Sequence, residues 1–235
     1  MDPSKPIIFY DIASGPPVTS YAINPWKTRY ALNFKGVHYK TEWVELPQVA
    51  SHRDGTPFYT LPIIQDPSTG KIVGDSFEIA QYLDAVYLDG PRLIPASTTA
   101  LHRAFNTHVD KIFTDGIVIL CGHGLPFNPQ TAEQSKAEFV RLAGVSSWDD
   151  LTLRGAERTA KLAEFKDALG ALAKCYVDEY EPFLEGKQVS YADIIVGGWL
   201  QFLKVTLEEW KEVRTWHGSR WERVLQALDK YADVK

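Results

Sequence analysis

Residues 61–80, LPIIQDPSTGKIVGDSFEIA, constrain the fold of this chain more than any other stretch. Two short apolar runs flank a turn, and the pair Asp75-Ser76 then precedes an amphipathic helical pattern. Proline cannot donate to a ladder, so Pro62 belongs at the first residue of a strand or in a cis turn. Asp75 and Ser76 supply a carboxylate, a hydroxyl and free backbone N–H groups at the positive end of a helix. We therefore expect an extended, peptide-like ligand to pair with the strand edge at Leu61 and to place its charged end at Asp75-Ser76.

The residues before that stretch alternate strand and helix patterns. A buried strand is predicted over 6–12, a loop rich in Gly, Pro, Ser and Thr follows, and Asn24-Pro25 opens a helix as its N-cap and first-turn proline. Gly36 ends this helix, and a second strand is predicted over 38–46. The order is β-α-β, a short irregular or helical stretch, then β-β-α, with a right-handed crossover in the first half.

Beyond a Gly- and Pro-containing linker only helical patterns remain. We divide the chain into a domain over 1–90, a linker over 91–97 and an all-helical domain over 98–235. Within the second domain, the segment Ser190-Tyr-Ala-Asp193 has the form of a capping box before an apolar helix.

Composition and charge exclude several classes of partner. The formal net charge of −5 argues against nucleic acid or an anionic membrane as the main partner. No apolar run approaches the roughly 18 residues of a membrane-spanning helix, and the N-terminus lacks a secretory signal pattern. Two widely separated cysteines, Cys121 and Cys175, fit a reducing compartment, so we expect a cytoplasmic protein. No cluster of His, Cys and acidic residues has the spacing of metal ligands, so we expect no metal.

These motifs together resemble the glutathione transferase family, over nearly the whole chain. The resemblance rests on Leu61-Pro62, Asp75-Ser76, the FEIAQYL helix over 77–83 and the cap at Ser190–Asp193. It implies an α/β thioredoxin-like N-terminal domain plus an all-α helical C-terminal domain. The stretch PWKTRYALNFKG, residues 25–36, looks most like the fungal etherase-related class, which is similar to bacterial β-aryl etherases.

The resemblance implies how glutathione, the co-substrate, would be held. Pro62 would be the cis-proline, and the backbone of Leu61 would pair with the cysteinyl segment. Ser76 would bind the γ-glutamyl end by its hydroxyl and N–H, with Asp75 towards the ammonium. His52 or Arg53 would meet the glycyl carboxylate.

The group that activates the thiol is where this chain departs from the family. A thiol pKa of roughly 8.5 leaves little thiolate at neutral pH, so a polar group near the first helix is needed. The resemblance places that group at Ala22, which has no hydroxyl. The catalytic candidates nearby are Ser20, Tyr21 and Asn24; Ser20 has the right chemistry if the loop folds back, and Asn24 is an amide donor or a plain N-cap.

The resemblance also implies a hydrophobic site between the domains. Its walls would include Val109, Ile112 and Phe113, with Phe127 in a capping loop, and it would suit small hydrophobic aromatic ligands. The expected function is a glutathione transferase acting on or binding phenolic compounds like those of lignin or wood extractives, by conjugation or ether cleavage. The alternative is a non-catalytic ligandin that sequesters polyphenols. A homodimer is implied in either case.

Overall fold

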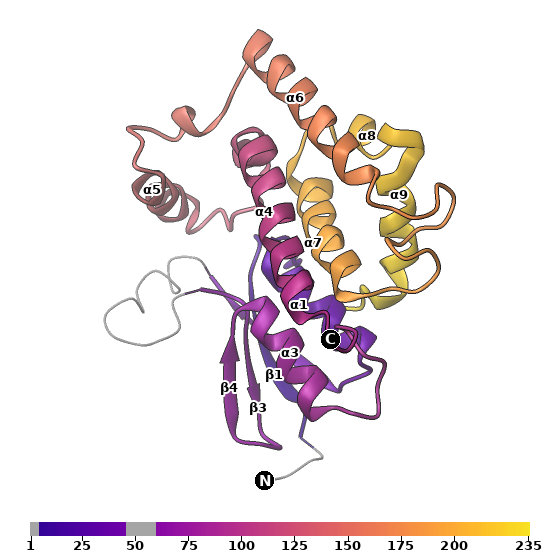
Figure 1. Cartoon of the computed structure of the whole chain (residues 1–235). Coiled ribbons are helices and arrows are strands. Elements are labelled where there is room, and N and C mark those ends of the chain that lie inside the picture. The colour runs from indigo at the N-terminus through magenta and orange to yellow at the C-terminus, as the bar shows by residue number, and fades with distance from the viewer. Residues whose placement is uncertain (1–4, 46–59) are drawn as a thin grey trace.

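The chain folds into a small sheet with helices beside it, followed by a bundle of helices (Figure 1). The structure is a computed structural model that describes residues 5–45 and 60–235. The strands are β1 (Ile7–Ile12), β2 (Tyr39–Val44), β3 (Ile63–Asp66) and β4 (Lys71–Gly74). The helices beside them are α1 (Ile23–Phe34) and α3 (Ser76–Val86). The helices of the second half are α4 (Thr99–Cys121), α5 (Ala132–Ala143), α6 (Gly155–Ala173), α7 (Tyr191–Thr206), α8 (Trp210–Val213) and α9 (Trp216–Leu228), with short 3-10 turns over Gly122–Gly124, Asp149–Leu151 and Asp229–Tyr231.

The sheet has the mixed topology that the sequence predicted. Its order is β2-β1-β3-β4, with β1 parallel to β2 and antiparallel to β3, and with β3 and β4 forming the hairpin. In the described part of the second half there are two isolated bridges but no strand. The α/β plus all-α fold class is therefore confirmed. Among the described residues no helix is both long enough and apolar enough to cross a membrane.

The first helix begins two residues earlier than the sequence suggested. Its N-cap is Ala22, whose extended backbone (φ −77°, ψ 145°) precedes the helix and whose side chain makes no cap. The Ala22 carbonyl accepts the Trp26 N–H at 3.1 Å, so Asn24 is the second helical residue. The prediction of Asn24 as N-cap was wrong. The first helical hydrogen bond is the backbone bond from the Trp26 N–H to the Ala22 carbonyl, and no side-chain oxygen caps the helix.

Two adjacent glycines bring the halves of the molecule together. A Cβ at Gly198 on α7 would lie 2.9 Å from the Ile23 carbonyl oxygen, and one at Gly197 would lie 3.3 Å from the Tyr30 ring. Only hydrogen fits at these positions, so α1 packs directly on α7. A hydrogen bond of 2.6 Å from Gln201 to the Tyr30 hydroxyl adds to this contact.

The predicted capping box is present at the start of α7. The Ser190 hydroxyl accepts from the Ala192 N–H at 3.2 Å, and Asp193 accepts from the Ser190 N–H at 2.8 Å. The other oxygen of Asp193 accepts from the Leu184 N–H at 2.7 Å. Burial raises the pKa of Asp193 to about 6, while these hydrogen bonds oppose the rise. The box thus starts a helix and also fixes the segment that precedes it.

The C-terminal segment returns to the first half and covers β2, an edge of the described sheet. The Thr41 N–H donates to the Lys235 carbonyl at 2.8 Å, and the Tyr39 hydroxyl donates to the Asp233 carbonyl at 2.8 Å. An uncovered edge strand invites pairing with another chain, so this segment protects the sheet as well as tying the two halves.

Candidate ligand-binding cleft

The strand register brings the predicted ligand-holding residues to one end of the sheet. Tyr10 on β1 is opposite Ile63, and Ile63 is opposite Gly74 on β4. The chain therefore enters β3 through Leu61-Pro62 at the end where β1 finishes and leads towards α1, and it leaves β4 through Asp75-Ser76 at that same end. The Leu61–Pro62 peptide bond is cis, as expected.

Asp75 caps α3 and keeps one carboxylate oxygen available. Its Oδ1 accepts from the N–H groups of Phe77 at 2.8 Å and Glu78 at 3.1 Å. Its backbone has a positive φ of 67° with ψ 128°, a conformation that L-residues rarely adopt. The side chain is exposed, and Oδ2 has no hydrogen bond within the described residues. The Asp75 carboxylate accepts from the N–H groups of Phe77 and Glu78 but not from that of Ser76. Within the described residues the Ser76 N–H is therefore the donor of this turn that stays free.

Ser76 lies where the two halves of the molecule meet. It is the first residue of α3 and is buried, and its carbonyl accepts from the Tyr191 hydroxyl of α7 at 2.7 Å. The ring of Phe77 packs edge-on against Tyr191, with centroids 5.6 Å apart. The start of α3 is thereby held against the start of α7.

A buried lysine joins the start of α1 to α4 beside this site. Lys27 Nζ lies 2.7 Å from Asp110 Oδ1 and 3.1 Å from Asn106 Oδ1. Trp199 Nε1 donates to the same Asp110 oxygen at 2.7 Å. Burial lowers the pKa of Lys27, while Asp110 and, to a lesser degree, Asp75 act to raise it. Sequence reasoning missed this cluster, although an ionisable residue such as Asp110 beside an apolar helical stripe is a signal for a buried partner.

The hydroxyl of Ser20 is engaged inside the first half. Its hydroxyl donates to Asp11 Oδ2 at 2.8 Å, and Arg29 donates to the same oxygen at 2.6 Å. Both Ser20 and Asp11 are buried, and the Ser20 carbonyl accepts from Trp26 Nε1 at 3.1 Å. The single hydroxyl proton of Ser20 is therefore used by Asp11. This placement corrects the expectation that Ser20 meets the thiol.

Of the other two catalytic candidates, only Asn24 is exposed. Tyr21 is buried, and burial, followed by the charge of Asp11, raises the pKa of its phenol. Asn24 is an exposed residue in the first turn of α1, where backbone N–H groups lack intrahelical partners. The positive end of α1 thus carries an amide side chain and free N–H groups, with the short side chain of Ala22 beside them. His52 and Arg53 lie outside the described residues.

Two of the four predicted hydrophobic-site residues belong to the core. Val109 and Phe113 are fully buried; the Phe113 ring stacks on Trp199 with centroids 5.1 Å apart and meets Phe165 edge-on at 5.4 Å. They pack inside the bundle because their face of α4 is turned towards α6 and α7, so their assignment to the cleft wall was wrong. Ile112 is half-buried and lines a cavity of about 340 Å³ between α4 and α6.

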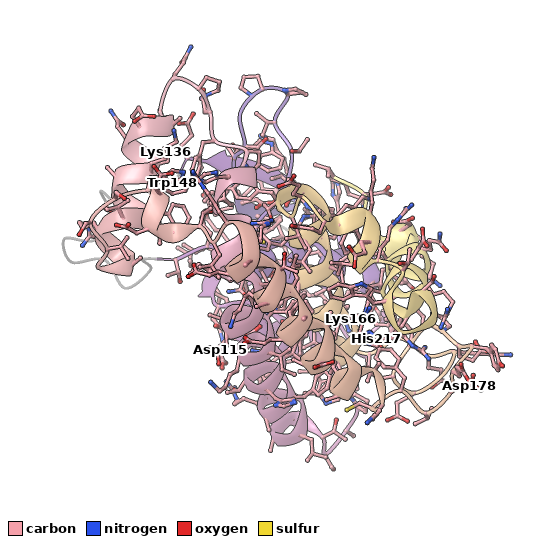
Figure 2. All side chains as sticks on the ribbon, turned by 90° about the horizontal axis from the view of Figure 1, so that it is seen from above. Asp115, Lys136, Trp148, Lys166, Asp178 and His217 are labelled. Carbon is pink, nitrogen blue, oxygen red and sulfur yellow. The ribbon has the colours of Figure 1, made fainter. Side chains whose placement is uncertain are left out.

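Phe127 lies in a loop that contacts the loop before α1. The Gly15 N–H donates to the Pro126 carbonyl at 2.7 Å, so these two loops lie side by side. The Phe127 ring packs against Phe139 of α5 and Trp148, with centroids 5.7 and 5.8 Å apart. In Figure 2, Trp148 and Lys136 lie together at the opposite end of the molecule from Asp178.

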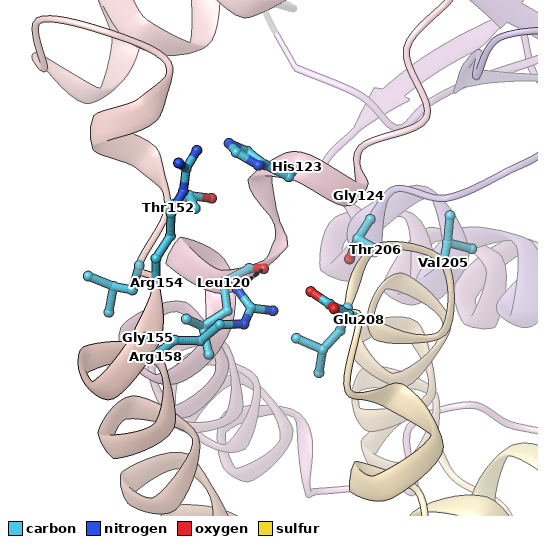
Figure 3. Close-up of a pocket in the computed structure, with 12 residues that line it drawn as sticks. Leu120, His123, Gly124, Thr152, Arg154, Gly155, Arg158, Val205, Thr206 and Glu208 are labelled. Atoms are coloured by element: carbon cyan, nitrogen blue, oxygen red, sulfur yellow. Dashed lines mark hydrogen bonds between the residues drawn. The ribbon is translucent and has the colours of Figure 1, made fainter.

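A cavity of about 510 Å³ opens elsewhere in the helical half, between the ends of α4 and α7 and the start of α6 (Figure 3). Arg158 and Glu208 reach into it from opposite walls, and Arg158 is bound to Glu209 by two contacts of 2.6 Å. Of the predicted glutathione-holding residues, the four that the structure describes, Leu61, Pro62, Asp75 and Ser76, do not line this cavity. In the part of the chain that the structure describes, no group of three or more His, Cys, Asp or Glu side chains could hold a metal ion.

Comparisons with known proteins identify relatives of both halves. Residues 100–231 match the family model described as glutathione S-transferase, C-terminal domain, and residues 23–86 match glutathione S-transferase, N-terminal domain. A glutathione S-transferase of Ceriporiopsis subvermispora, solved in complex with glutathione, is 36% identical with a TM-score of 0.88, over 98% of this chain and 99% of that one. Glutathione transferase GSTFuA3 from Phanerochaete chrysosporium is 29% identical with a TM-score of 0.85, over 98% and 99% of the two chains. The glutathione S-transferase-like protein ustS of Aspergillus flavus is 27% identical, over 89% of this chain and 84% of its own length.

The likeness to a bacterial etherase extends to the fold only. The β-etherase LigF from Sphingobium is 17% identical with a TM-score of 0.56. At that identity the shared fold does not assign ether cleavage to this chain.

Proposed function

The chain belongs to the glutathione S-transferase family, and we propose that it binds glutathione at Leu61-Pro62 and Asp75-Ser76 and directs the thiol onto hydrophobic aromatic electrophiles. Glutathione is its co-substrate, as the relatives solved with bound glutathione indicate. The observation that carries the proposal is the convergence of Leu61-Pro62, Asp75-Ser76 and the open start of α1 at one end of the sheet.

The γ-glutamyl end of glutathione matches the groups at the start of α3. Its ammonium pairs with Asp75 Oδ2, since Oδ1 is taken by the helix cap. Its carboxylate meets the free Ser76 N–H and the Ser76 hydroxyl at the positive end of the helix. The backbone of Leu61 pairs with the cysteinyl segment and leads the thiol towards the start of α1.

The start of α1 lowers the free energy that is needed to deprotonate the glutathione thiol. The side-chain amide of Asn24 and the free N–H groups of the first turn stabilise a negative sulfur there. Each pKa unit by which the thiol is lowered corresponds to about 1.4 kcal/mol. The thiolate then attacks an electrophilic carbon of the aromatic substrate; a carbon–sulfur bond forms and the leaving group departs with its electron pair, as an aryloxide where an ether is cleaved.

Glutathione titration tests the binding half of this proposal. Asp75→Asn keeps the helix cap but removes the charge, so we expect the Kd for glutathione to rise about tenfold or more, since a charged hydrogen bond is worth about 1.5–3 kcal/mol. The exposed Asp89→Asn serves as the matched control and should leave the Kd unchanged. Equal Kd values for wild type and Asp75→Asn would refute the assignment of Asp75.

Thiolate absorbance and turnover test the chemical half. We expect glutathione to show thiolate absorbance when bound, to react with a chromogenic aromatic electrophile and a β-aryl ether, and to lose both signals in Asn24→Ala. Full retention of turnover in Asn24→Ala would remove Asn24 from the mechanism.

A second function, a ligandin that binds glutathione and polyphenols without turnover, is favoured by one observation. Ala22 stands where the resemblance places a hydroxyl, and the nearby Ser20 hydroxyl is bound to Asp11. Glutathione binding with neither thiolate nor turnover would select the ligandin. The homodimer that the resemblance implies stays a proposal, and sedimentation velocity of the purified protein tests it.

A further inference from the structure

The rare backbone conformation of Asp75 needs support from its surroundings. A residue with φ 67° and ψ 128° persists only where neighbouring contacts over-determine it. The peptide group between Ser76 and Phe77, which follows Asp75, is held at both ends. The Phe77 N–H donates to Asp75 Oδ1 at 2.8 Å, and the Ser76 carbonyl accepts from the Tyr191 hydroxyl at 2.7 Å. The first bond is local, whereas the second comes from the helical half of the molecule.

Tyr191 is a rigid donor. It is fully buried, its backbone N–H donates to the Leu93 carbonyl at 2.8 Å, and its ring meets Phe77 edge-on with centroids 5.6 Å apart. The capping box that begins at Ser190 fixes the turn of α7 to which it belongs. Burial raises the pKa of the Tyr191 phenol, so the hydroxyl keeps its proton at neutral pH. That single proton is donated to the Ser76 carbonyl.

This contact bears on the groups of Ser76 that meet the γ-glutamyl carboxylate. A peptide group is planar, so holding its N–H and its C=O fixes the plane on one side of the Ser76 Cα. The Asp75 carboxylate and the Tyr191 hydroxyl thereby leave Ser76 little freedom to turn. Without the hydroxyl, the carbonyl end of this peptide group is released from α7. Asp75 can then relax towards a common backbone conformation, which turns the Ser76 N–H and hydroxyl away from the ligand.

We propose that Tyr191 is a positioning residue for glutathione, which orients Ser76 from across the boundary between the two halves. The residue acts through the Ser76 carbonyl. This inference rests on the proposed binding of the γ-glutamyl carboxylate at Ser76. It has the consequence that glutathione affinity depends on the packing of α7 against α3, and is not a property of the first half alone.

Glutathione titration of hydroxyl-deleted variants tests the proposal. Tyr191→Phe removes the donor and keeps the ring, so we expect the Kd for glutathione to rise about threefold to tenfold, the effect of one buried neutral hydrogen bond. Tyr30→Phe is the matched control, because it also removes a buried hydroxyl that joins the two halves, but this hydroxyl bonds to Gln201 of α7 and not to α3. Its Kd should stay within about twofold of wild type.

Two analogues of glutathione separate the orientation of Ser76 from a general loosening of the protein. The γ-aminobutyryl analogue of the tripeptide lacks the α-carboxylate of the γ-glutamyl group, and the glutaryl analogue lacks its ammonium. Tyr191→Phe should raise the Kd of the glutaryl analogue by the same factor as that of glutathione. It should change the Kd of the aminobutyryl analogue by less than about twofold, since this ligand has no carboxylate for Ser76 to bind. A purely structural effect would weaken all three ligands alike.

Unnatural residues at position 191 separate the hydrogen bond from the ring that carries it. 4-Aminophenylalanine keeps a donor at the same place and should restore the wild-type Kd. 4-Fluorophenylalanine fills the place of the oxygen without donating, and should raise the Kd as Tyr191→Phe does. The test therefore does not depend on the folding of Tyr191→Phe, and urea unfolding of each variant shows that it is folded during the titration.

Four results would overturn the proposal: an unchanged Kd for glutathione in the variants without a donor, an equal rise in Tyr30→Phe, an equal rise for the aminobutyryl analogue, or no rescue by 4-aminophenylalanine. Failure of the proposed function is seen in the wild type, which would then not bind glutathione or would bind the aminobutyryl analogue equally well. Failure of this inference alone leaves a wild type that binds glutathione and prefers it, so the two failures are distinguishable.

Discussion

Replacing Ser20 by alanine separates a structural role for this residue from a catalytic one. The substitution removes the 2.8 Å hydrogen bond from the hydroxyl to Asp11 Oδ2, while Asp11 keeps Arg29 at 2.6 Å and the Ile12 N–H at 2.7 Å. A buried hydrogen bond to a charged group contributes about 1.5–3 kcal/mol. Since Ser20 is 4% exposed and Asp11 is fully buried, water does not replace the lost donor, and we expect a loss of about 2 kcal/mol.

Thermal and urea unfolding measure this loss. For a chain of this length, about 2 kcal/mol lowers Tm by about 4–8 °C. The exposed Ser146→Ala is the matched control and should leave Tm within about 1 °C of wild type. Well below Tm, glutathione affinity and bound-thiolate absorbance should match wild type in Ser20→Ala. Unchanged stability together with lost thiolate would refute the structural reading and return Ser20 to the catalytic site.

Four further substitutions test close packing and buried charge in the helices. Gly198→Ala places a Cβ 2.9 Å from the Ile23 carbonyl, so overpacking should cost about 1–3 kcal/mol in urea unfolding, and an unchanged midpoint would contradict the close approach of α1 to α7. Lys27→Met leaves Asp110 without its cation and should lower the free energy of unfolding by about 2–4 kcal/mol. The double variant Lys27→Met/Asp110→Asn should regain part of that stability in urea unfolding, whereas a loss equal to the sum of the two single losses would show that the pair is not coupled. Burial lowers the pKa of His217 in the folded protein, so the unfolded state binds a proton at this imidazole more readily. The free energy of unfolding that His217 contributes is therefore fully present above a pH of about 6.5 and is lost as the pH falls below it. The decrease in urea midpoint between pH 7.5 and 5.5 should be smaller in His217→Asn, and an equal decrease would count against this linkage.

Features whose hydrogen bonds span a few residues were predictable from the sequence. The cap at Asp75 bonds to residues two and three positions later, and the capping box at Ser190–Asp193 closes over four residues. The β3–β4 hairpin is equally local. The cis bond at Leu61–Pro62 was one of two alternatives that the residues left open, and the resemblance implied it. Their order along the chain was enough to predict the fold class.

The sequence did not predict the contacts between helices, because these depend on which face of each helix packs against its neighbour. α5 and its packing on Phe127 and Trp148 were absent from the prediction, and the aromatic rings that its Phe139 meets come from segments before and after the helix. On α4 the periodicity identified an apolar face, but only the packed bundle shows that Phe113 enters the core while Ile112 lines a cavity.

The sequence by itself determined the hairpin, the cap and the linear motifs that would hold glutathione, because each is a short-range arrangement. Tertiary structure alone decided what the groups around them do. Ser20 turns inward because Asp11 on β1, which is buried and paired with Arg29 on α1, accepts the hydrogen bond of its hydroxyl. Lys27 and Asp110 are 83 positions apart in the chain and meet only because α1 packs on the helical bundle. Such pairings are set by burial of charges at contacts between distant segments, and spacing along the chain carries no record of them.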